Sequence, residues 1–181
     1  RDALAGRVVA VLFEKPSTRT RSAFEVAAHE LGAHSTYIDP ASSHLGVAES
    51  VEDTARVLGR YYDGIAFRGF AQESVETLAA HAGVPVWNAL TDTWHPTQAL
   101  ADLLTIREHA PQGRRAAVCF VGDGHDNVVN SLLIAGALHG IDLRVASPLA
   151  LQPDPEIVTA ARERAVHTGA RILVTDDLDE A

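Results

Sequence analysis

The stretch Arg7-Val-Val-Ala-Val-Leu-Phe13 runs directly into Glu-Lys-Pro-Ser17-Thr-Arg-Thr-Arg21, and this passage decides the fold. Its first half is an apolar, β-branched run of strand length, which predicts a buried strand. Apolar residues then recur at helical spacing from Phe24 to Leu31, and Gly32 is placed to end that helix. A strand that leads through a polar turn into a helix is half of a βαβ unit, from which parallel sheets are built.

The same alternation of strand and helix continues along the chain. Further strands are predicted at 35–39, 65–67, 84–87, 116–121, 143–146 and 172–174. Further helices are predicted at 50–62, 73–82, 96–109, 127–139 and 155–167, with Ser50 and Pro96 placed to begin two of them. We therefore expect an α/β protein.

The expected architecture is two doubly wound parallel-sheet domains, and a break in the rhythm near 110–115 separates them. The first domain is predicted at 1–110 and the second at 111–181. The second holds only three predicted strands and two predicted helices, which is short for a doubly wound sheet. We expect this second domain to be incomplete in this chain.

Composition excludes several classes of protein. The 181 residues are 46% hydrophobic and 22% charged, as in globular proteins and unlike disordered or fibrous ones. The formal net charge is −9, which argues against a nucleic-acid-binding protein but not against a small anionic ligand. No apolar run approaches the ~20 residues that span a membrane, and the start of the chain lacks the apolar core of a signal peptide. We expect a cytoplasmic protein that does not bind membranes.

Polar loops follow several predicted strands, and open parallel sheets bind ligands at those strand ends. The first loop holds the hydroxyls of Ser17, Thr18 and Thr20 and the guanidinium groups of Arg19 and Arg21, without a carboxylate among them. The N-terminus of the following helix adds unpaired N–H groups and partial positive charge. A phosphate dianion is the expected ligand. A capping loop with solvated arginines is the alternative.

The second loop is His95-Pro96-Thr97-Gln98, at the start of a predicted helix. A neutral imidazole at His95 and the amide of Gln98 would suit an amide or carbamoyl group better than a second phosphate. An ordinary helix start with an exposed His95 is the alternative. Arg68 follows the strand at 65–67 and is expected to add a guanidinium group at the same edge of the sheet.

The third loop begins Gly122-Asp-Gly124, which resembles the start of a dinucleotide-binding turn, but Asn127 stands where the third glycine would be. We favour a structural role for this loop; the alternative is that the amides of Asn127 and Asn130 bind a small polar ligand. The nine histidines form no metal-binding pattern, so no metal site is predicted. The single cysteine, Cys119, lies mid-strand and is expected to be inert core.

The segments 13–21, 24–25, 53–60, 67–70, 95–98 and 122–131 together resemble the aspartate/ornithine carbamoyltransferase superfamily, most closely its ornithine-specific branch. The resemblance covers essentially the whole chain, and the combination of Ser-Thr-Arg-Thr-Arg with His-Pro-Thr-Gln carries it. It implies transfer of the carbamoyl group of carbamoyl phosphate to the side-chain amine of L-ornithine, which gives L-citrulline and phosphate. It implies no cofactor and no metal, and a place in arginine metabolism.

The resemblance also implies roles for individual residues. Carbamoyl phosphate would be bound by Ser17, Thr18, Arg19, Thr20, His44, Arg68, His95 and Gln98. Of these, Arg68, His95 and Gln98 would be catalytic, and Asn127 would bind the amino-acid end of ornithine. The family further implies a homotrimer, or a multiple of trimers, with active sites shared between subunits and with His44 reaching the neighbouring site.

This sequence departs from the family pattern in two ways. Relatives often carry Gln in place of His44, and some carry Lys in place of Ala48. The family also has a helix before Arg1 and, beyond Ala181, a Ser-Met-Gly loop and a His-Cys-Leu-Pro motif that complete the ornithine site. We therefore expect a chain that ends at Ala181 to turn over slowly or not at all.

Several alternatives follow from these departures. One is a carbamoyltransferase that acts on putrescine, lysine or an acylated ornithine, and another is a truncated chain that binds carbamoyl phosphate without catalysis. No Arg lies between Gly122 and Leu143, which argues against aspartate as the acceptor. A nucleotide-binding protein is the remaining alternative.

Overall fold

The computed structural model describes residues 2–39, 49–110 and 114–181. In chain order its elements are β1 (Val8–Phe13), α1 (Thr18–Glu30), β2 (His34–Ile38), α2 (Val51–Tyr61), β3 (Gly64–Arg68), α3 (Gln72–His81), β4 (Val86–Leu90), α4 (Pro96–His109), β5 (Ala117–Val121), α5 (Asn127–Leu138), β6 (Asp142–Ala146), the 3₁₀ turn η1 (Leu149–Leu151), α6 (Pro155–Thr168) and β7 (Arg171–Thr175). The strict alternation confirms the predicted α/β class. Within the described ranges, no helix is both long and apolar enough to cross a membrane.

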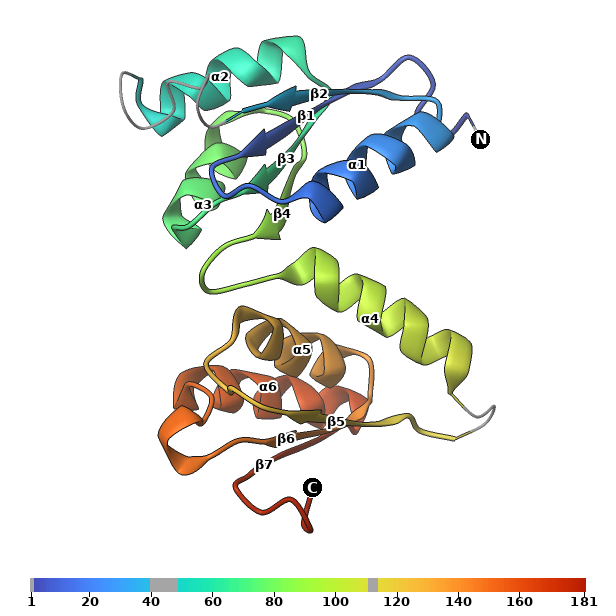
Figure 1. The fold of residues 1–181 in the computed structure, drawn as a ribbon, viewed down its shortest axis with the longest axis vertical. Coiled ribbons are helices and arrows are strands. Elements are labelled where there is room, and N and C mark those ends of the chain that lie inside the picture. The colour runs from blue at the N-terminus through green and yellow to red at the C-terminus, as the bar shows by residue number, and fades with distance from the viewer. Residues whose placement is uncertain (1, 40–48, 111–113) are drawn as a thin grey trace. The chain divides into compact units, whose positions relative to one another are not determined.

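The chain divides into two compact units, Arg1–Asp92 and Thr93–Ala181. In the first unit, parallel strands form a sheet in the order β2-β1-β3-β4 (Figure 1). One face packs against α2 and α3 through a core of Ala10, Leu12, Ala55, Ile65, Phe67, Val75, Leu78 and Ala82. Side chains alternate along a strand, so Val11 and Phe13 face the opposite side, which α1 covers (Figure 1). Helices on both faces confirm a doubly wound sheet here.

Local capping explains where the helices of the first unit begin and end. Ser50 begins α2 as predicted, because its Oγ accepts a hydrogen bond of 3.1 Å from the backbone N–H of Asp53. Gly32 follows α1 with φ of +84°, a left-handed conformation that glycine adopts without strain. The predicted end of α1 at this glycine is therefore confirmed.

In the second unit, parallel strands form a sheet in the order β5-β6-β7. Helices α5 and α6 pack together on one face over Leu133, Leu143 and Val145 (Figure 1). On β5 the residues that point the other way, Cys119 among them, are exposed in the part of the chain that the structure describes. The expectation that Cys119 is a core residue is wrong, because alternation along β5 places it on the face opposite α5 and α6.

Strand β4 starts and ends later than predicted, at Val86–Leu90 instead of 84–87. The polar residue Asn88 obscures this strand in the sequence, yet in the sheet its Nδ2 donates to Gln72 Oε1 over 3.2 Å. Helix α4 packs against α5 and so lies in the second compact unit. The prediction of binding domains at 1–110 and 111–181 stays a prediction.

Candidate functional site

The sheet of the first unit has a topological switch point between β1 and β3. From β1 the chain crosses through α1 to β2 on one side, whereas β3 lies on the other side of β1. At the carboxyl ends Phe13 is paired with Arg68, and the N–H of Glu14 donates to the carbonyl of Arg68 over 2.7 Å. Open parallel sheets bind ligands at such a point. Arg68 therefore lies next to the loop that follows β1, at the point where a ligand site is expected.

The N-terminus of α1 supplies hydrogen-bond donors at this point. Ser17 caps the helix, with Oγ accepting from the N–H of Thr20 at 3.3 Å and donating to Thr20 Oγ1 at 3.0 Å. The first turn contains no acidic residue, and Thr18 and Arg19 are exposed. The helix N-terminus therefore presents partial positive charge, a guanidinium group and hydroxyls, which together favour an anion.

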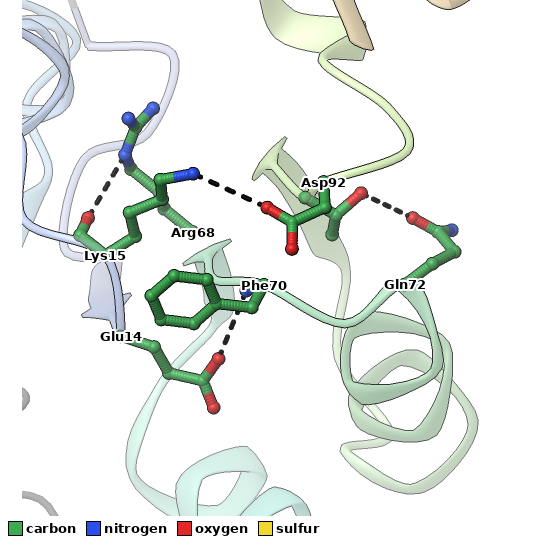
Figure 2. A network of polar contacts seen from close by, with 7 residues as sticks. Glu14, Lys15, Arg68, Phe70, Gln72 and Asp92 are labelled. Atoms are coloured by element: carbon green, nitrogen blue, oxygen red, sulfur yellow. Dashed lines mark hydrogen bonds and ion pairs between the residues drawn. The ribbon is translucent and has the colours of Figure 1, made fainter. Parts of the chain in front are cut away.

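Arg68 is hydrogen-bonded to the loop that leads into this helix start. Its Nε donates to the carbonyl oxygen of Lys15 over 3.1 Å (Figure 2). The two terminal nitrogens of the guanidinium take no part in that bond. Partial burial, and then the positive charge of Arg19, lower the pKa of Arg68 below its ordinary value. The lowered pKa means that the charged form of Arg68 is disfavoured at this site. An anion bound next to both guanidinium groups would relieve that penalty.

Arg21 does not share this arrangement. Its Nε donates to Glu25 Oε1 over 2.8 Å, and its guanidinium lies 3.9 Å from the centre of the Tyr37 ring. The sequence predicted a doubled arginine facing the anion. In the structure it is instead the positive charge of Arg19 that acts on Arg68, while the guanidinium of Arg21 is bound by Glu25 on α1 and lies against Tyr37 on β2.

A set of contacts that sequence reasoning missed supports the loop around Arg68 (Figure 2). Glu14 Oε2 accepts a bond of 3.4 Å from the N–H of Phe70, and a Cβ at Gly69 would overlap that carboxylate. Lys15 Nζ lies 3.4 Å from Asp92 Oδ1 and 5.3 Å from the centre of the Phe70 ring. The only signal in the sequence is the Glu-Lys pair between strand and loop. These contacts fix where Arg68 leaves the sheet.

In the second unit, the start of α5 holds the predicted histidine loop. The N–H of His95 donates to Ser131 Oγ over 2.7 Å, and Asn130 Nδ2 donates to the carbonyl of Thr93 over 3.0 Å. Ser131 Oγ in turn donates to the carbonyl of Asn127 over 2.9 Å. His95 and Asn127, predicted from separate loops, are therefore linked through one hydroxyl group.

The remaining predicted residues are distributed as follows. Gln98 is exposed, and its amide donates to Asp102 Oδ1 over 2.9 Å along α4. His44 and Ala48 lie outside the described residues. The structure thus collects Ser17, Thr18, Arg19, Thr20 and Arg68 in the first unit, and His95, Gln98 and Asn127 in the second.

The Gly122-Asp-Gly124 turn has a packing role. The N–H of Gly124 donates to the carbonyl of Leu151 over 2.8 Å, and a Cβ at Gly124 would lie 2.5 Å from that same oxygen. Asp126 caps α5 by accepting from the N–H of Val128 over 2.7 Å. These contacts support the structural interpretation of the turn.

Apart from the predicted site, the described residues form a groove in the second unit but no metal-binding group. A groove of about 460 Å³ in the second unit is lined in part by Leu100, Leu104 and Arg107, and by no residue of the predicted site. Across residues 2–39, 49–110 and 114–181, His, Cys, Asp and Glu side chains form no group of three or more that could hold a metal ion.

Comparison with known proteins gives a consistent result for both units. Residues 1–108 match the aspartate/ornithine carbamoyltransferase carbamoyl-P binding domain, and residues 114–181 match the Asp/Orn binding domain of the same family. The chain is 54% identical over 178 residues to the catabolic ornithine carbamoyltransferase of Bacillus licheniformis, and 55% identical over 179 residues to the ornithine carbamoyltransferase of Cutibacterium acnes. Both matches cover 98% of this chain, and 53% and 54% of the relatives.

Solved structures give the same picture. The ornithine carbamoyltransferase of Pyrococcus furiosus superposes with a TM-score of 0.93 at 43% identity, covering 98% of this chain and 56% of that one. The anabolic ornithine carbamoyltransferase of Campylobacter jejuni also gives 0.93, at 38% identity, covering 99% and 60%. The chain spans about half the length of the curated relatives it matches. Since the two domain matches together cover nearly all of its residues, the chain belongs to the aspartate/ornithine carbamoyltransferase family.

Proposed function

We propose that the protein carrying this sequence is an ornithine carbamoyltransferase, which makes L-citrulline and phosphate from carbamoyl phosphate and L-ornithine. The observation that carries the proposal is the pair Arg19 and Arg68 beside a helix N-terminus at the switch point of the first sheet. The names of the relatives support ornithine as the acceptor. We assign carbamoyl-phosphate binding to a domain at 1–110 and part of ornithine binding to 111–181.

The phosphate group is the part of the substrate that the first unit would hold. Arg19 and Arg68 would pair with its oxygens, while the hydroxyls of Ser17, Thr18 and Thr20 and the N–H groups of the α1 N-terminus would donate to it. Charge-assisted hydrogen bonds of this kind are stronger than neutral ones. The same groups would stabilise the charge that accumulates on phosphate as it leaves, so Arg68 is assigned a catalytic role as well.

His95 and Gln98 are the residues we assign to the carbamoyl group. A neutral His95 would donate to the carbamoyl oxygen, and the Gln98 amide would turn from Asp102 to the carbamoyl amide. Asn127 would bind the amino-acid end of ornithine. The neutral side-chain amine of ornithine then attacks the carbamoyl carbon, the new C–N bond forms, the C–O bond to phosphate breaks, and the amine passes a proton to the departing phosphate. Positioning and charge stabilisation are sufficient for this step, without a cofactor or metal.

The quaternary and cellular setting is also part of the proposal. We infer a homotrimer, or a multiple of trimers, in which His44 of one subunit reaches the phosphate bound by the next. We further infer a cytoplasmic location and a role in arginine metabolism. Sedimentation of the whole protein tests the oligomer, and a monomer at working concentration would contradict it.

Citrulline formation from carbamoyl phosphate tests the reaction, with ornithine, putrescine, lysine and aspartate as parallel acceptors. We expect the whole protein to make a product with ornithine alone. A product with another amine would keep the chemistry and overturn the acceptor. No product together with retained carbamoyl-phosphate binding, measured by calorimetry, would favour the alternative of a binding chain without catalysis. Arg68→Gln should abolish that binding, whereas Arg56→Gln, on the exposed face of α2, should not.

A further inference from the structure

Ser131 has the contacts of a positioning residue. It is 5% exposed, and its hydroxyl makes two hydrogen bonds: it accepts from the N–H of His95 at 2.7 Å and donates to the carbonyl of Asn127 at 2.9 Å. Both bonds are made to backbone atoms of residues that contact a substrate in the proposed function. Ser131 itself has no such role in that proposal.

The backbone of His95 is held on both sides. Its N–H is bound to Ser131, and its carbonyl accepts from the N–H groups of Gln98 at 3.1 Å and Ala99 at 3.2 Å, which starts α4. Two residues earlier, the carbonyl of Thr93 is bound by Asn130, which is 6% exposed. The segment from Thr93 to His95 is therefore attached to the first turns of α5 at both ends. This attachment sets the direction in which the imidazole leaves the backbone.

We propose that Ser131 is a positioning residue that couples His95, which holds the carbamoyl group, to Asn127, which holds the acceptor. This inference rests on the proposed function. A single hydroxyl between the two backbones fixes the carbamoyl-holding imidazole relative to the helix start that binds the amino acid. Because a catalytic group must be held within a fraction of an ångström of its working position, loss of this hydroxyl should lower the rate of the chemical step.

The test is a double-mutant cycle on citrulline formation in the whole protein. We expect Ser131→Ala to lower kcat about tenfold, with the KM for carbamoyl phosphate changed less than about twofold, because residues of the first unit hold the phosphate. In a His95→Gln background the same substitution should change kcat less than about twofold, since the residue through which it acts is already altered. Ser131→Thr keeps the hydroxyl and should keep most of the activity.

Thr159→Ala is the matched control, because Thr159 Oγ1 also bonds a carbonyl four residues earlier, over 2.8 Å, but on α6. It should leave kcat unchanged. A tenfold loss from Ser131→Ala in both backgrounds would show that Ser131 acts through folding alone, and an unchanged kcat would show no role. Either result overturns the proposal.

Hydrogen exchange of the His95 backbone amide tests the hydrogen bond to Ser131 without an activity assay. The His95 N–H should exchange slowly in the wild-type protein and quickly in Ser131→Ala. Equal exchange rates in the two proteins would overturn the attachment itself. A wild-type protein that makes no citrulline would instead refute the proposed function, and the positioning role of Ser131 in that reaction with it, while the exchange rates would still report the attachment.

Discussion

Arg19 and Arg68 place two like charges beside each other, and an anion bound there would remove an unfavourable interaction. We expect Arg19→Gln to lower the affinity for carbamoyl phosphate at least tenfold, since a hydrogen bond to a charged group is worth about 1.5–3 kcal/mol and a tenfold change in Kd is about 1.4 kcal/mol. The unliganded protein should not lose thermal stability, because partial burial still lowers the pKa of Arg68 but the second cause, the positive charge of Arg19, is gone. Calorimetry and thermal unfolding measure the two effects.

The control for this substitution is Arg56→Gln, which removes the same charge from an exposed pair with Asp53 on α2. Surface pairs contribute little, so both affinity and stability should stay near the wild-type values. Equal losses of affinity in the two variants would show that net charge, and not the site at the switch point, governs binding.

At the same scale, sequence reasoning identified the arginines but not their directions. Arg68 was predictable because it ends a strand, and parallel strand ends meet at one edge. The direction of the Arg21 side chain was not predictable. Its guanidinium forms an ion pair with Glu25, one turn later on α1, and lies over the ring of Tyr37 on β2. The Glu25 contact has a signature in the sequence, since the two residues are four apart, but the contact across to β2 exists only once the sheet has formed.

Among the elements, β1 and β3 are joined at their amino ends by Asp63. The N–H of Val8 and the guanidinium of Arg7 both bind its carboxylate, and they lower its pKa below the ordinary value. A lowered native pKa stabilises the fold above the unfolded pKa and loses that effect as the pH falls through the native value. Asp63→Asn should therefore destabilise the protein at neutral pH, and the difference should shrink as the pH falls below about 4.

Urea unfolding at a series of pH values measures this difference. Asp53→Asn, which removes a carboxylate from an exposed pair on α2, is the comparison and should show a smaller effect at neutral pH. A difference between wild type and Asp63→Asn that stays constant from neutral to acidic pH would show that the carboxylate acts through shape rather than charge.

The turn between β5 and α5 supplies a second test at this scale. A Cβ at Gly124 would lie 2.5 Å from the carbonyl oxygen of Leu151 and 2.8 Å from the nitrogen of Pro153, so the backbone must move. We expect Gly124→Ala to destabilise the protein by about 1–3 kcal/mol in urea unfolding, as overpacking usually does. Phosphate affinity should be unchanged, because the phosphate site that we propose lies in the first unit.

Gly136→Ala makes the same change in the same unit but meets the end of a flexible side chain, Leu143 Cδ2, at 3.3 Å. The gain in helix propensity of about 1 kcal/mol offsets that tight contact, so its stability should stay close to wild type. If Gly124→Ala and Gly136→Ala behave alike, the close approach at Gly124 does not constrain the turn.

The boundaries of the strands show which of them an apolar pattern in the sequence can predict. Strands such as β1 were predicted closely because their apolar runs end at polar loops. Strand β4 was shifted because Asn88 finds a partner, Gln72, on α3, which makes a polar residue acceptable within the sheet. Cys119 was misplaced because a short apolar run does not reveal which face of its sheet the helices cover.

For the whole molecule, the sequence indicated a repeated βα rhythm with a break, but not which unit each predicted residue joins. His95 follows β4 in the chain and lies within the predicted binding domain at 1–110, which stays a prediction. The bonds from Asn130 and Ser131 attach Thr93 and His95 to α5, and the second compact unit accordingly begins at Thr93. Such bonds join residues 36 or 37 apart in the chain, and no local pattern announces them.

Two separate cores, one around Leu12 and Phe67 and one around Leu133 and Val145, predict that a ligand of one unit stabilises that unit. A ligand present at 100 times its Kd raises the free energy needed to open the unit that binds it by about 2.7 kcal/mol. Inorganic phosphate should therefore slow amide exchange at 17–21, 68–70 and in the strands of the first unit. Exchange in α5, α6 and their strands should be unchanged.

Exchange followed by mass spectrometry on this 181-residue chain measures the effect peptide by peptide. Arg68→Gln should abolish the protection at 17–21, because it removes one of the two cations that we propose hold the anion. Protection of equal size in both units would contradict the prediction, since it would mean that the two cores open as one cooperative structure. Protection that is confined to the first unit and is lost in Arg68→Gln would support a phosphate site at the switch point, independently of catalysis.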